Sequence, residues 1–145
     1  MNAGPENNSP LFALSEEHQA IREAVRDLCE AKVAPYAAAV DEEARYPEEA
    51  AAALQAADFH APHVPEEYGG AGADALATVL VIEEVARVCV SSSLIPAVNK
   101  LGSLPVQISG GEEIKKKYLT ALAKGEGGFS YCLSEPDAGH AGGSL

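Results

Sequence analysis

Apolar residues recur every three or four positions along most of the chain, the spacing of helices with one buried face. The first such stretch begins at Ser15, a residue suited to cap a helix, and Glu16 and Glu17 favour the positive end of its dipole. Pro35 is expected to end or kink this helix. A short helix from Tyr36 to about Ala44 and a third from Glu48 to about Ala57 follow.

The most apolar stretch runs from Asp74, a second capping residue, to about Val90. Its apolar positions surround nearly the whole helix, which predicts a central, buried element. The many β-branched residues would also suit a strand, but the length and a Glu83–Arg87 pair at i, i+4 favour a helix. The segment 91–108 contains Pro96 and Pro105, so we expect it to be helical in pieces.

The last helix is predicted from Glu112 to Gly125, where glycine stops it. Its expected buried stripe consists of Ile114, Tyr118, Leu119 and Leu122. Between the third and fourth helices, residues 59–72 are interrupted by prolines and paired glycines and predict a loop.

The pattern changes near the C-terminal end. Phe129, Tyr131 and Leu133 alternate with polar or small residues, which is typical of a half-buried strand. The residues from Pro136 to Gly139 then predict a turn whose backbone N–H groups could receive an anion. The fold class is therefore mainly α, an up-and-down helical bundle with one short strand near the C-terminus.

The composition excludes several classes of binding partner. The 145 residues suit a single core, and a net charge of −12 argues against nucleic acid or an anionic membrane as partner. No apolar run is long enough to span a bilayer, and the first 14 residues show no presequence pattern. These features predict a cytoplasmic protein.

Other candidate chemistry is weak. His60 and His63, with Glu66 nearby, have the spacing of metal ligands but lie in a loop without a third ligand, so no metal site is predicted. The acid pairs 66–67 and 83–84 fit exposed salt bridges better than acid–base catalysis. Cys29 and Cys89 fit small core residues, and the run 115–117 of lysines fits a solvated helix face.

Two motifs carry a family resemblance. The segment 131–139, Tyr-Cys-Leu-Ser-Glu-Pro-Asp-Ala-Gly, closely resembles the flavin-contacting signature of the acyl-CoA dehydrogenase family. The run 65–70, Pro-Glu-Glu-Tyr-Gly-Gly, also resembles that family and lies at the spacing expected from Tyr131. The resemblance implies an N-terminal segment at 1–14, a helical domain at 15–127 and the start of a β domain at 128–145.

The resemblance also implies a cofactor and a reaction, the FAD-dependent α,β-dehydrogenation of acyl-CoA thioesters, with electrons leaving to an electron-transfer flavoprotein. It places residues 92–109 along the acyl tunnel. The implied cofactor-binding residues are Tyr131, Leu133, Ser134, Ala138, Gly139 and His140. His140 stands where the family has a serine that also touches substrate, so it is the implied substrate contact as well.

No catalytic residue is assigned, because the family's glutamate base and later domains have no counterpart in these 145 residues. We expect that a truncation or frame change ended a longer gene here, and that the chain alone is inactive. The full-length form is expected to be a homo-oligomer. The alternative is a non-catalytic helical remnant that serves as an interaction module through exposed apolar surface.

Overall fold

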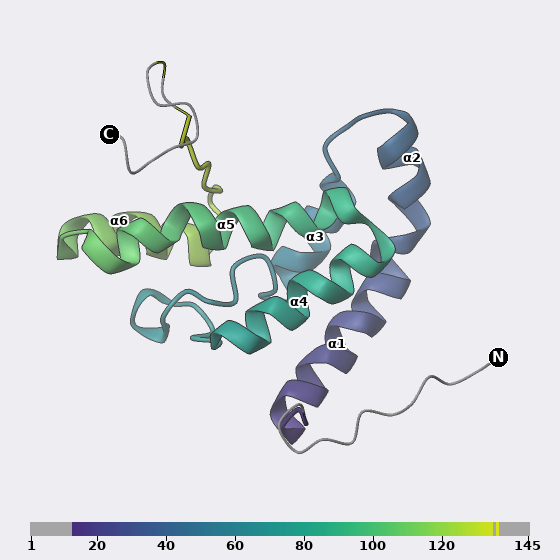
Figure 1. The fold of residues 1–145 in the computed structure, drawn as a ribbon, viewed down its shortest axis with the longest axis horizontal. Coiled ribbons are helices and arrows are strands. Elements are labelled where there is room, and N and C mark those ends of the chain that lie inside the picture. The colour runs from purple at the N-terminus through teal and green to yellow at the C-terminus, as the bar shows by residue number, and fades with distance from the viewer. Residues whose placement is uncertain (1–12, 135, 137–145) are drawn as a thin grey trace.

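The computed structural model describes residues 13–134 and 136, and within them the fold is built from helices (Figure 1). The α-helices are α1 (Glu16–Lys32), α2 (Ala37–Glu42), α3 (Glu48–Ala56), α4 (Ala75–Val88), α5 (Val90–Ser109) and α6 (Glu112–Ala123). Short 3₁₀ turns lie at Ala34–Tyr36 and Glu66–Tyr68. The predicted mainly α fold class is confirmed.

Capping residues explain where helices α1 and α4 begin. The Ser15 hydroxyl accepts a hydrogen bond from the His18 backbone N–H at 3.1 Å, which caps α1. The Asp74 carboxylate likewise accepts from Ala77 N–H at 2.8 Å at the start of α4. Both predicted caps are confirmed, and Pro35 lies in the 3₁₀ turn that follows α1.

The main core lies where α1 and α4 pack side by side, with α2 and α3 closing one end (Figure 1). Its buried members are Val25, Cys29, Val33, Val40, Ala50, Leu54, Val81, Val85 and Cys89. A second cluster joins the loop after α3 to α6 and contains Ala61, Val64, Tyr68, Leu119 and Leu122. Cys29 and Cys89 are therefore core residues, as predicted.

Helix α4 is less enclosed than its composition indicated. Leu76 is 45% exposed and Val79 54% exposed, whereas Leu80, Val81 and Val85 are buried. The prediction of a helix buried on nearly every side was wrong, because α1 and α5 cover only part of its circumference. The prediction that Glu83 and Glu84 are both exposed was also wrong, since Glu84 is 3% exposed.

Helix α5 is continuous, which corrects the prediction of helical pieces. Pro96 and Pro105 both lie inside it. A proline removes one backbone hydrogen bond and crowds the preceding turn, but the remaining bonds and tertiary packing hold the helix. A row of exposed apolar residues runs along it, Val90, Leu94, Leu101, Leu104 and Ile108.

Helix α6 ends as predicted at a glycine, since Gly125 has φ +69° just after the C-cap. Its predicted buried stripe is half right. Leu119 and Leu122 are buried, but Ile114 and Tyr118 are 49% and 46% exposed, because the loop after α3 covers only one side of the helix.

The strand predicted at 129–134 is not formed among the described residues. A strand needs a neighbouring strand to receive its backbone hydrogen bonds, and the described part of the chain offers none. This segment instead leaves the helical body beside α5 (Figure 1). No helix within residues 13–134 is both long and apolar enough to cross a membrane.

Candidate functional site

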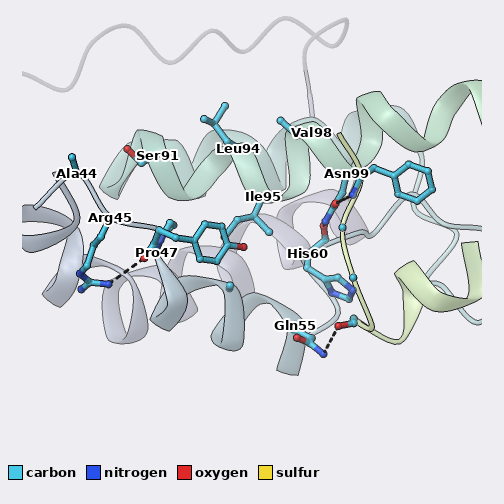
Figure 2. A pocket seen from close by; sticks show the side chains of 16 residues that line it. Ala44, Arg45, Pro47, Gln55, His60, Ser91, Leu94, Ile95, Val98 and Asn99 are labelled. Atoms are coloured by element: carbon cyan, nitrogen blue, oxygen red, sulfur yellow. Dashed lines mark hydrogen bonds between the residues drawn. The ribbon is translucent and has the colours of Figure 1, made fainter. Parts of the chain in front are cut away.

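A groove of about 780 Å³ lies between α3 and α5 and is closed at one end by the segment that follows α6 (Figure 2). Helix α5 contributes Ser91, Leu94, Ile95, Val98 and Asn99 to it. The other side consists of Ala44, Arg45, Tyr46, Pro47, Ala51, Gln55 and His60, and the closing segment adds Gly125, Gly127, Gly128 and Phe129. We call this cavity the α3–α5 groove.

The groove is apolar along its α5 wall, where Leu94, Ile95 and Val98 follow one another along the helix (Figure 2). Arg45 is the one charged residue of the lining that the structure describes, and Glu49 already holds its guanidinium through two hydrogen bonds of 2.9 Å. These bonds lower the pKa of the Glu49 carboxyl. The groove therefore suits an uncharged, apolar group.

Asn99 joins the groove to the segment that closes it. Its Nδ2 donates to the His60 carbonyl at 3.0 Å, and its Oδ1 accepts from the Phe129 backbone N–H at 3.0 Å (Figure 2). Gly102, one turn further along α5, faces the same segment. A Cβ atom at Gly102 would lie 2.7 Å from the Phe129 Cβ, so the two backbones approach closely there.

The predicted cofactor residues begin two positions after this contact. Tyr131 is 44% exposed, Leu133 is half-buried and Ser134 is exposed, so the segment presents side chains at its surface. Ala138, Gly139 and His140 lie outside the described residues. Phe129, two positions before the predicted flavin segment, lines the end of the α3–α5 groove.

The two loop histidines are each engaged in a hydrogen bond. His60 Nε2 donates to the Leu122 carbonyl at 2.8 Å, and His63 Nε2 lies 2.7 Å from the Ser103 hydroxyl. Among residues 13–134 and 136, no three His, Cys, Asp or Glu side chains are grouped to hold a metal ion. Burial, with smaller contributions from Lys100 and His60, lowers the pKa of His63 to about 4.

A Ser–His–Asp arrangement lies at the start of α1 and α4, and its His18 and Asp74 line a second cavity of about 460 Å³. His18 Nδ1 lies 2.6 Å from Ser15 Oγ, and its Nε2 lies 3.1 Å from the Asp74 carboxylate. The Ser15 hydroxyl and the Asp74 carboxylate each cap their own helix. The Ala77 N–H, and then His18, lower the pKa of Asp74. The arrangement ties two helix starts together.

Sequence reasoning did not find Asn99 or Gly102. A usable signal was present, since an amide and a glycine in the middle of a helix both call for a specific reason. A buried amide must find hydrogen-bond partners, and a mid-helix glycine often marks close backbone approach. What the sequence cannot give is the identity of the partners, which lie 39 and 30 residues away.

Comparison with known proteins places the chain in a family. Residues 15–126 match the family model of the acyl-CoA dehydrogenase N-terminal domain. Over 129 residues the chain is 58% identical to a probable acyl-CoA dehydrogenase, FadE25, of Mycobacterium tuberculosis, covering 89% of this chain and 33% of that protein. The chain therefore belongs to the acyl-CoA dehydrogenase family.

Solved structures agree with the fold. A glutaryl-coenzyme A dehydrogenase in complex with glutaryl-CoA superposes with a TM-score of 0.82 at 33% identity, over 92% of this chain and 35% of that one. An acyl-CoA dehydrogenase from Bacillus anthracis complexed with FAD gives 0.78 at 32% identity, over 94% and 23%. The chain spans about one third of the length of the curated relatives it matches.

Proposed function

We propose that this chain forms the helical N-terminal part of a FAD-dependent acyl-CoA dehydrogenase site. The α3–α5 groove takes the acyl chain, and residues 131–134 lie against the flavin. The observation that carries the proposal is that Phe129, two positions before the flavin segment, lines the groove and bonds Asn99 of α5. The family's structures include complexes with an acyl-CoA and with FAD.

The residues of the segment fit one face of a flavin. Tyr131 and Leu133 offer partly exposed apolar surface, and the Ser134 hydroxyl has both a donor and acceptors. We assign Ala138, Gly139 and His140 to the cofactor on the resemblance alone, with His140 also against substrate. Bound FAD would supply the hydride acceptor that no amino-acid side chain provides.

The described lining of the α3–α5 groove contains no carboxylate. Removal of an α-proton needs a base within hydrogen-bond reach of the substrate, so this groove orients an acyl chain without supplying that base. We therefore expect no turnover from the 145 residues alone. The electron-transfer flavoprotein partner, the homo-oligomeric full-length form, the cytoplasmic location and the division at residues 14 and 127 stay predictions.

One observation favours the alternative of an interaction module. The exposed apolar row of α5 includes Val90 and Ile108, which are 71% and 72% exposed. An apolar row of this length tends to associate with another surface in water. Acyl-CoA and flavin binding separate the two functions, because the interaction module requires neither.

The decisive experiment replaces the matching residues of the Mycobacterium tuberculosis relative with residues 15–134 of this chain, and assays the hybrid beside its parent. We expect the hybrid to hold FAD and to oxidise an acyl-CoA with an artificial electron acceptor. A charge in the groove, Val98→Asp, should raise the KM for acyl-CoA at least tenfold, the order expected for an unpaired charge in an apolar site. A folded hybrid without FAD would contradict the proposal.

The matched control is Val79→Asp. Val79 is a valine on the exposed side of α4, outside the groove lining. It adds the same charge, so it should leave the KM near the hybrid's own value. An equal rise in KM from both variants would mean that net charge, and not groove contact, sets substrate binding.

A further inference from the structure

We propose that Asn99 is a positioning residue that fixes the flavin-contacting segment against the α3–α5 groove, with Gly102 as the second fixed point. This inference rests on the proposed function and adds to it a residue outside the flavin motif. Asn99 belongs to α5, whereas the residues proposed to touch the flavin begin at Tyr131.

Both halves of the Asn99 amide are used. Its Nδ2 donates to the His60 carbonyl, and its Oδ1 accepts from the Phe129 N–H, each at 3.0 Å. The side chain is 7% exposed, so water does not compete for these bonds. One amide therefore links α5, the loop after α3 and the segment after α6.

Gly102 sets how closely the segment lies on α5. A Cβ atom there would stand 2.7 Å from the Phe129 Cβ and 3.2 Å from the Ser130 carbonyl oxygen. A Cβ atom essentially never comes within 3.0 Å of another heavy atom, so any side chain at 102 would move Phe129 away. Asn99 fixes the segment along the helix, and Gly102 fixes its distance from the helix.

These contacts matter because residues 129–134 form no strand in the described structure. Without a ladder of backbone bonds, the position of Tyr131 depends on how residues 129 and 130 are held. Tyr131 lies two residues beyond the Phe129 bond, so a displacement of Phe129 also displaces Tyr131.

The chain contains its own reporter for this segment. Cys132 is exposed, whereas Cys29 and Cys89 are buried, and burial raises the pKa of Cys29 to about 11. A thiol-directed nitroxide should therefore attach at Cys132 without any substitution. Its electron paramagnetic resonance spectrum then measures the mobility of the segment in the 145-residue chain, with no flavin present.

We expect Asn99→Ala to raise the mobile fraction of the label while circular dichroism shows the helices retained. Gly102→Ala should do the same by displacing Phe129, and it tests the same anchor where Asn99→Ala fails to fold. Gln107→Ala is the matched control, since Gln107 lies on the same helix and its side-chain amide bonds Ser103 rather than residues 129–130. Unchanged label mobility in folded Asn99→Ala or Gly102→Ala would overturn the proposal.

A second measurement ties the anchor to the cofactor. In the hybrid enzyme, Asn99→Ala should weaken FAD binding about tenfold, the net worth of one buried hydrogen bond. Gln107→Ala should leave FAD affinity unchanged. A mobile label combined with unchanged FAD affinity would show an anchor without a positioning role, and would overturn the proposal. A hybrid that never binds FAD fails the proposed function, while the label result stands separately.

Discussion

Arg26 on α1 and Glu84 on α4 form a two-point ion pair at the interface between these helices, which pack more extensively than any other described pair. Arg26 Nη2 lies 2.6 Å from one carboxylate oxygen and its Nε lies 3.0 Å from the other. Arg87 adds a third bond to Glu84 at 3.1 Å. The Glu84 carboxylate is buried, and both guanidinium groups reach water. The three bonds from Arg26 and Arg87 pair the charge of Glu84 within the fold.

Replacing Glu84 with glutamine should destabilise the protein by about 1–3 kcal/mol, less than for a wholly buried pair because the arginines remain solvated. The Arg26 hydrogen bond is the main cause of the lowered pKa of Glu84, and its contribution is present above the ordinary glutamate pKa of about 4.3. The contribution is lost as the pH falls through the lowered value. Urea unfolding of Glu84→Gln at pH 7 and below pH 4 measures both effects.

Glu83→Gln is the matched control, because Glu83 is exposed and makes no ion pair in the described structure. It should change the free energy of unfolding by less than about 0.5 kcal/mol. Equal losses from the two variants would mean that the helix dipole or net charge, and not the Arg26 contact, is responsible.

The same pair shows what the sequence could and could not predict. Helix positions and both side-chain caps follow from local spacing and capping chemistry, so Ser15 and Asp74 were found correctly. The partner of Arg87 was not, because the i, i+4 rule selects Glu83 whereas packing of α1 against α4 selects Glu84 and Glu30. Which side of a helix is buried depends on its neighbours, and spacing alone does not contain them.

His63 should make stability depend on pH in mildly acidic solution. Burial holds its pKa near 4 in the folded chain, against about 6.5 when unfolded. Between these values the unfolded chain binds more protons, so stability falls as the pH falls, by at most about 1.4 kcal/mol per pH unit. Chemical unfolding at intervals from pH 6.5 to 5 measures this slope above the range where carboxylates titrate.

His63→Gln removes the titrating group and keeps an amide that can bond the Ser103 hydroxyl. The variant should show a smaller slope across the same pH range. A slope equal to that of the original chain would assign the effect to other groups.

The loop that carries the Pro-Glu-Glu-Tyr-Gly-Gly motif depends on one glycine for space. A Cβ atom at Gly70 would lie 2.1 Å from the Val64 carbonyl oxygen. The loop is closed there, since Gly72 N–H donates to the same carbonyl at 2.8 Å. Gly70→Ala should destabilise by about 2 kcal/mol or more, through overpacking against backbone.

Gly127 supplies the comparison, because a Cβ atom there meets nothing within 4 Å. Gly127→Ala should be neutral or slightly stabilising, since alanine restricts the unfolded chain. Thermal unfolding of the two variants separates lost space from a general effect of the methyl group. A Gly70→Ala protein as stable as Gly127→Ala would show that the loop can shift.

The candidate site likewise has one part that the sequence predicts and one part that only the tertiary structure gives. The motif directed attention to Tyr131, Leu133 and Ser134, whose places along the chain are local information. The groove is tertiary information, because its walls come from α3, α5 and the segment after α6. Asn99 joins those parts through two bonds that no local pattern specifies.

The continuous α5 helix predicts opposite outcomes at its two prolines. Pro105 is exposed in the helix interior, where proline is about 3 kcal/mol less favourable than alanine. Removing the proline also raises the conformational entropy of the unfolded chain, which offsets up to about 1 kcal/mol of the stabilisation. Pro105→Ala should therefore stabilise the protein by about 2 kcal/mol and raise the melting temperature.

Pro96 lies in the same helix but is fully buried, so Pro96→Ala also empties space in the core. The lost packing should cancel the helix gain, leaving the melting temperature unchanged or lower. Differential scanning calorimetry of both variants makes the comparison. If Pro105→Ala melted below the original chain, the residue would be serving as a break between helical pieces, and the single helix from Val90 to Ser109 would be contradicted.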